Sequence, residues 1–145
     1  MKTLKSTVLI FFWGISLNLV SQTYTFPDES EQHEGTWLQW PHGHEYGNSY
    51  MTENNATWVA MTNALQANEM VHIIYYDATH KTQILNLLNA ASVPLTNVTF
   101  HISQTNDVWS RDDFGVYLRT SSGSLVLGDF GFNGWGGIII SPKIT

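Results

Sequence analysis

Short runs of β-branched and aromatic residues recur along the chain, and such runs are typical of strands. Five of them are Thr36–Trp40, Met70–Tyr76, Val98–Ile102, Phe114–Arg119 and Leu125–Phe130. The last two runs flank Ser121-Ser-Gly-Ser124, a turn sequence, and therefore predict a hairpin.

Two segments between the first three strands carry apolar residues at helical spacing instead. The first runs from Asn55 to Ala67, with Asn54 or Asn55 as its N-cap. The second can be capped by Asp77 or Thr79 and ends before Pro94. The order strand, helix, strand, helix, strand, hairpin predicts an α/β fold with helices covering one or both faces of the sheet.

The N-terminus has a different pattern. Two lysines precede a short apolar run that ends near Ser21-Gln22, which is the arrangement of a secretory signal peptide. A retained membrane anchor is the alternative, but about 20 apolar residues are needed to span a bilayer and this run is shorter. We therefore expect residues 1–22 to be a signal peptide, residues 23–145 to form one folding unit, and the protein to be secreted or periplasmic.

Composition narrows the function classes. The chain has 145 residues, 43% of them hydrophobic, which is enough apolar material for the core of one domain. Removal of residues 1–22 leaves 4 basic residues against 12 acidic ones, a difference of −8. This charge disfavours nucleic acids and anionic membranes as partners and weakly favours cationic ligands. The absence of cysteine excludes disulfides, thiolate metal sites and a cysteine nucleophile within these residues.

The segment from Thr105 to Gly115 concentrates polar, charged and aromatic residues between a strand and the hairpin. A carboxylate beside a ring such as Trp109 suits a guanidinium ligand, whose planar donors match two oxygens and whose cationic face stacks on aromatic rings. The alternative is a purely structural Asx-type turn in which Arg111 pairs with a neighbouring aspartate.

Three histidines raise the question of a metal site. His42 and His44 lie in residues 42–50, which we expect to form a polar and aromatic loop, and His33 precedes them. No third ligand stands at a recognisable motif spacing, so we predict no metal site.

Three blocks occur in the order of one known family: Glu31 to Pro41, Thr105-Asn-Asp-Val-Trp-Ser-Arg-Asp112, and Phe132-Asn-Gly-Trp-Gly-Gly137. Together they resemble the family of agmatine deiminases and bacterial (Porphyromonas-type) peptidyl-arginine deiminases. The resemblance implies a pentein, a five-bladed α/β propeller of ββαβ modules, of which this chain supplies roughly the first two blades.

The resemblance also implies a reaction without a cofactor: a cysteine thiolate attacks a guanidino carbon, a histidine moves protons, ammonia leaves, and water releases a ureido product. Asp112 matches the family's first substrate-binding aspartate, and Trp109 matches an aromatic wall of the pocket. The family's cysteine and catalytic histidine have no counterpart here, so we expect a truncated chain that is inactive alone. In agmatine deiminases, the Arg-Asp pair of this block is usually followed by an aromatic residue, glycine and proline. In this chain, Arg111-Asp112 is followed by Asp113 instead.

The substrate therefore remains open between agmatine and peptidyl-arginine. Two other function classes also remain open: a non-catalytic secreted module that binds cationic or sugar ligands, and a histidine-based metal protein.

Overall fold

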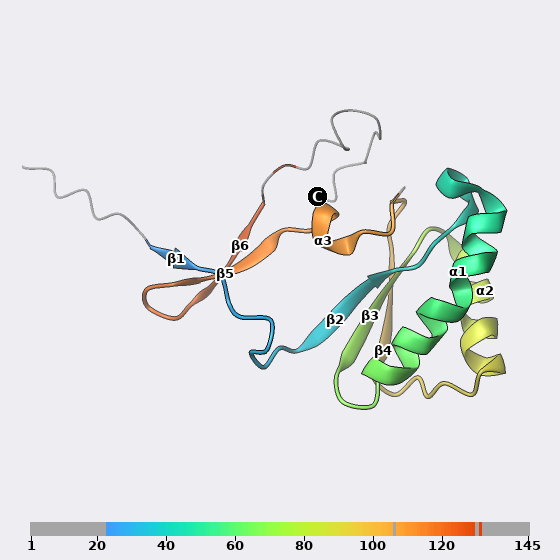
Figure 1. The fold of residues 1–145 in the computed structure, drawn as a ribbon, viewed down its shortest axis with the longest axis horizontal. Helices are drawn as coiled ribbons and strands as arrows, with labels where there is room; N and C mark the ends of the chain where they lie inside the picture. The colour runs from blue at the N-terminus through green and yellow to red at the C-terminus, as the bar shows by residue number, and fades with distance from the viewer. Residues whose placement is uncertain (1–22, 106, 130, 132–145) are drawn as a thin grey trace, which may run out of the picture.

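The computed structural model describes residues 23–105, 107–129 and 131, and within them the chain forms two three-stranded sheets. The parallel sheet has the order β2 (Gly35–Gln39), β3 (Met70–Tyr75), β4 (Val98–Ile102). The antiparallel sheet has the order β1 (Tyr24–Thr25), β5 (Val116–Thr120), β6 (Leu125–Gly128). Figure 1 shows the parallel sheet beside the two long helices and the antiparallel sheet on its other side.

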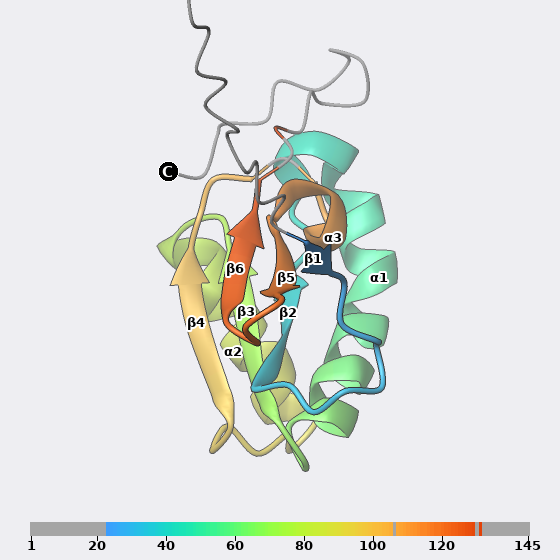
Figure 2. The same cartoon turned by 90° about the vertical axis from the view of Figure 1, so that its left-hand side faces the viewer.

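The helices α1 (Gly43–Leu65) and α2 (Ala78–Ala90) connect the parallel strands and cover one face of their sheet (Figure 2). Of the two predicted caps, Asp77 and Thr79, Asp77 is the N-cap of α2, because its Oδ1 accepts the His80 N–H at 2.8 Å. The core between helices and sheet consists of fully buried apolar side chains: Trp40, Val71, Ile73, Ile84, Leu88 and Val93. The mixed α/β class predicted from the sequence is confirmed.

The predicted start of the first helix was wrong. The helix begins at Gly43 rather than Asn55, so most of the expected loop 42–50 is helical and Asn54 is an interior residue. The N-cap is His42, whose Nδ1 accepts the backbone N–H of His44. Histidine is not one of the usual N-cap residues, and Gly47, at φ 79°, kinks the helix. Because of these two features, the apolar periodicity of the sequence did not indicate the first turns of α1.

The predicted strands and the hairpin are confirmed to within two residues at their ends. The pattern missed two short elements, β1 and α3 (Ser110–Asp113). β1 is only two residues long and is defined by its pairing with β5, where Tyr24 faces Thr120. Elements of this length are stabilised by tertiary contacts and leave no periodic signal.

No helix in the described part of the chain is long and apolar enough to cross a membrane. The predicted signal peptide, the glycine-rich block from Phe132 to Gly137 and the apolar C-terminal residues lie outside the described residues.

Candidate functional site

The candidate site lies where the chain passes from β4 of the parallel sheet to β5 of the antiparallel sheet. Residues 103–115 make this connection and include α3, which lies between the two sheets in Figure 1. Both residues predicted to bind substrate are in it: Trp109 is the N-cap of α3 and Asp112 is its third residue.

A buried carboxylate shapes the start of this connection. Asp107 is 1% exposed, and its Oδ1 accepts the backbone N–H of Val108 at 2.7 Å and that of Trp109 at 3.3 Å. An Asx-type turn, which the sequence analysis considered as the structural alternative, is therefore present, and it is centred on Asp107. By fixing the Trp109 N–H, the turn sets where α3 begins.

The two predicted substrate-binding side chains are accessible. Trp109 is 57% exposed, which is unusual for so large a ring, and Asp112 is also exposed. Among residues 23–105, 107–129 and 131, the Asp112 carboxylate has no hydrogen-bond or ion-pair partner. An accessible carboxylate one helical turn from an accessible ring can receive a planar cation.

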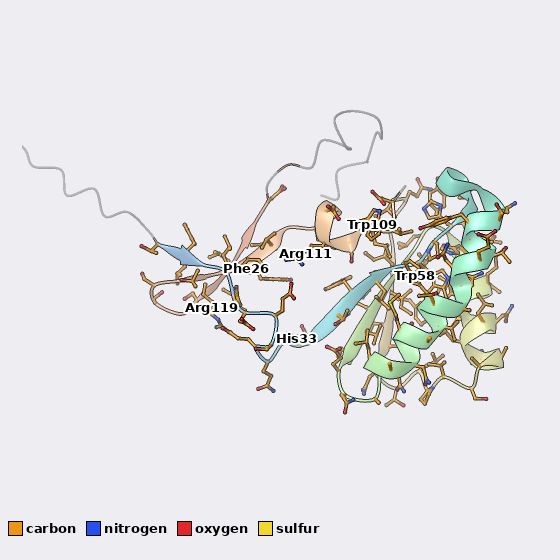
Figure 3. The ribbon with its side chains drawn as sticks, viewed as in Figure 1. Phe26, His33, Trp58, Trp109, Arg111 and Arg119 are labelled. Atoms are coloured by element: carbon orange, nitrogen blue, oxygen red, sulfur yellow. The ribbon has the colours of Figure 1, made fainter. Side chains whose placement is uncertain are left out.

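Among the side chains that the structure describes, Arg111 pairs with no aspartate, whereas pairing with a neighbouring aspartate is the structural alternative considered from the sequence. Its Nη1 instead donates to Oε1 of Glu29 at 2.9 Å, in an ion pair whose side chains are both more than three-quarters exposed. Figure 3 shows Arg111 extending from α3 toward the N-terminal segment that carries Phe26 and His33. Glu29 thus engages the guanidinium closest in sequence to Asp112.

α3 is also attached to the parallel sheet. Ser110 Oγ donates to the Trp37 carbonyl of β2 at 3.2 Å, and the Phe114 ring lies 5.4 Å from the Trp37 ring. Trp37 stacks on His72 of β3 at 4.5 Å on the sheet face opposite α1 and α2. Trp40, the other tryptophan of this segment, lies on the helical side of the sheet and is 1% exposed in the core.

A group of histidines lies under the connection, at the C-terminal ends of β2 and β3. His42 Nε2 donates to the Thr105 carbonyl at 2.6 Å, and His80 Nε2 donates to the Pro41 carbonyl at 3.1 Å. His80 Nδ1 also accepts the Tyr76 N–H at 3.1 Å. Burial lowers the pKa of His42, and burial together with the nearby His42 lowers the pKa of His80 to about 4. Both rings are therefore neutral at pH 7.

Within the described residues, no group of three or more His, Cys, Asp or Glu side chains could hold a metal ion. His33, the third histidine considered from the sequence, lies apart. Its hydrogen bond to the Glu31 carbonyl, and its pairing with Glu69, raise the pKa of its ring.

The sequence did not assign His42 and Asp107 to the site. Their roles depend on contacts with backbone atoms, which residue type and spacing do not reveal. For Asp107 a signal exists, because an aspartate side chain commonly accepts the backbone N–H two residues on, here that of the N-cap residue Trp109, in an Asx turn. For His42 the contact spans 63 residues and has no local signal.

A cavity of about 290 Å³ lies between α1 and α2, with Trp40, Met51, Ile84 and Leu87 among its lining residues. It belongs to the helical face of the parallel sheet. Trp109 and Asp112 do not line it, so it does not serve the candidate site.

Comparison with known proteins identifies relatives for this arrangement. Residues 25–143 match the family described as Porphyromonas-type peptidyl-arginine deiminase. A Shewanella frigidimarina protein assigned as an agmatine deiminase is 27% identical over 114 residues. That match covers 79% of this chain and 29% of the relative, so the chain spans less than a third of the length of the relative it matches.

Solved structures share the fold. A cysteine-to-serine variant of the Campylobacter jejuni agmatine deiminase with substrate bound superposes with a TM-score of 0.70 at 24% identity, over 88% of this chain and 35% of that one. A Porphyromonas gingivalis protein assigned as an arginine deiminase gives a TM-score of 0.62 at 24% identity, over 82% of this chain and 33% of that one.

Proposed function

The chain belongs to the Porphyromonas-type peptidyl-arginine deiminase family, and we propose that it is the N-terminal part of an enzyme that hydrolyses a guanidino group. Water replaces one terminal nitrogen of the guanidinium, so that a ureido group and ammonium are formed. The relatives named for agmatine and arginine deimination support this reaction class.

The observation that carries the proposal is that an accessible carboxylate, Asp112, follows an accessible ring, Trp109, by one turn of α3, where the Asp112 N–H donates to the Trp109 carbonyl at 3.0 Å. A carboxylate accepts two parallel hydrogen bonds from a guanidinium, and an indole face attracts the same cation. Because Glu29 engages Arg111, the Asp112 carboxylate is left for an external guanidinium.

This chain supplies substrate binding but not the covalent chemistry. It contains no cysteine, so the thiolate that attacks the guanidino carbon is proposed to come from a part of the protein outside these residues, together with the histidine that moves the protons. The 145-residue chain alone is therefore expected to be inactive.

We infer that the two sheets are roughly the first two blades of a pentein. The chain matches 35% of the Campylobacter jejuni agmatine deiminase, and this fraction supports about two blades out of five. One face of the antiparallel sheet carries Tyr117, Leu125 and Leu127, each 57–61% exposed, and alternation along paired strands places all three on the same face. A helix from the rest of such a blade would cover this apolar face.

We also propose that residues 1–22 direct export and are removed, which makes an extracellular peptidyl-arginine or free guanidino compound accessible as substrate. Mass spectrometry of the exported protein tests this, since a mature N-terminus near residue 22 or 23 is expected. An intact N-terminus retained in the membrane fraction would contradict it.

The function is tested on the product of the complete reading frame, assayed for ammonia and ureido product with agmatine and with an arginine-containing peptide. Formation of both products in equal amounts supports the proposal. The preferred substrate then decides between an agmatine deiminase and a peptidyl-arginine deiminase. Guanidinium binding without any ammonia release would favour the non-catalytic binding module instead.

A further inference from the structure

His42 joins two segments that are far apart in the sequence. Its side chain is 4% exposed, and its Nε2 donates to the carbonyl of Thr105, itself 3% exposed, across a separation of 63 residues. The distance of 2.6 Å is short for an N–H···O bond. Within the described chain, this bond attaches the start of the substrate-binding connection to the N-terminus of α1.

The partners of the ring define its protonation. Nδ1 accepts the backbone N–H of His44 at 3.3 Å, so the single hydrogen of the neutral ring lies on Nε2, where it is donated to Thr105. The rings of Tyr76, His44 and His80 surround it, at centroid distances of 4.7, 5.7 and 5.9 Å. His42 can therefore neither rotate freely nor exchange its two nitrogens without losing a bond.

Beyond Thr105 the chain enters the Asx turn of Asp107 and then α3. Asp107 holds the N–H groups of Val108 and Trp109, and Ser110 binds the Trp37 carbonyl. A local turn and two contacts with other elements thus fix the segment that carries Asp112, and His42 provides the first of these contacts.

We propose that His42 is a positioning residue for guanidinium binding: its Nε2–H fixes the Thr105 carbonyl and thereby sets the position of Trp109 and Asp112. This inference rests on the proposed function and adds a residue that contacts no substrate. Bidentate recognition of a planar cation depends on the orientation of the carboxylate, so a small displacement of α3 weakens binding. A neutral ring also adds no positive charge that would repel the guanidinium.

Two substitutions separate the two bonds of the ring. His42→Asn places an amide oxygen near the Nδ1 position and preserves the helix cap. Its side chain is too short for the amide nitrogen to reach the Thr105 carbonyl. His42→Gln places an amide nitrogen near the Nε2 position and keeps the donor to Thr105, but loses the cap. The matched control is His80→Asn, which removes an equally buried donor from a different carbonyl, that of Pro41.

In the complete enzyme, His42→Asn is expected to raise KM for the guanidino substrate about tenfold, His42→Gln less than threefold, and His80→Asn less than twofold. A purely structural role would lower the yield of folded enzyme but would leave its KM unchanged. An unchanged KM in folded His42→Asn, or an equal rise in His80→Asn, would overturn the proposal.

A second measurement does not depend on turnover. If the complete enzyme turned over no guanidino compound, the proposed function would be refuted, but the positioning role of His42 could still be tested. Amide hydrogen exchange of the Val108 and Trp109 N–H groups is expected to accelerate about tenfold in His42→Asn but not in His80→Asn. Equal exchange in both variants would overturn the positioning role. If His42→Asn does not fold, His42→Gln decides: native-like exchange supports the role, and fast exchange contradicts it.

Discussion

Arg111 and Glu29 form an ion pair of 2.9 Å across 82 residues, and Arg111 does not pair with the adjacent Asp112 within the described chain. The pair connects α3 to the N-terminal segment before β2. It leaves the carboxylate of the candidate site available, which is the arrangement that a guanidinium-binding site requires.

The ion pair itself is expected to contribute little to stability. Both side chains are more than three-quarters exposed, and exposed pairs typically contribute less than about 1 kcal/mol. Glu29→Gln should therefore change the free energy of unfolding in urea by less than about 0.5 kcal/mol. A loss of several times that value would show that the pair holds the N-terminal segment in place.

Asp112 is expected to be essential for turnover. In the complete protein, Asp112→Asn should lower kcat/KM by about 100-fold or more, because an amide removes the charge and presents donors to a ligand that has only donors. Steady-state ammonia release measures this change. The control is Glu53→Gln, an exposed carboxylate on α1 that should leave kcat/KM within twofold, and wild-type activity of Asp112→Asn would refute the assignment.

Asp107 is expected to stabilise the fold as well as the site. Asp107→Ala leaves two N–H groups without their acceptor in a buried place, at a cost of about 1–3 kcal/mol, measured by urea unfolding. Asp28 makes a similar turn at the surface, where its Oδ1 accepts from Ser30. Water replaces the lost acceptor there, so Asp28→Ala should cost less than about 0.5 kcal/mol. Equal costs would contradict the argument from burial.

Stability is expected to fall on acidification below about pH 6.5. Burial lowers the pKa of His42, and that of His80 to about 4, so the unfolded chain binds protons in this range that the folded chain does not. Each histidine contributes stability that is complete above its unfolded pKa and is lost toward its folded pKa, by at most about 1.4 kcal/mol per pH unit.

Urea unfolding between pH 7.5 and 4.5 measures this slope. His33, whose pKa is raised, acts in the opposite direction, but it is an exposed group. His80→Gln should flatten the dependence, and an unchanged slope in that variant would show that His80 is not the group that titrates.

Gly35 at the start of β2 is expected to tolerate no side chain. A Cβ there would overlap the backbone carbonyl of Met70, which the parallel register places opposite it. Gly35→Ala should therefore cost about 1–3 kcal/mol through displacement of β2 from β3. A Cβ at Gly123 meets open space, and its φ of 84° is the only penalty, so Gly123→Ala should cost about 1 kcal/mol in the same measurement.

Local patterns in the sequence were sufficient for the long elements. β-branched and aromatic runs predicted the three parallel strands and the hairpin, and Asp77 marked the start of α2, because period and capping are properties of adjacent residues. Three blocks in the order of one family, including the block that ends at Asp112, likewise indicated the family correctly. These signals need no knowledge of where distant residues lie.

Tertiary structure decided the rest. The histidine cap of α1, the two-residue β1 and the short α3 depend on contacts between segments, and short elements have no stability of their own to leave a pattern. The sequence could not show that Arg111 pairs with Glu29, or that His42 binds Thr105. Both contacts join residues more than sixty positions apart, and only the packing of the folded chain brings them within hydrogen-bond distance.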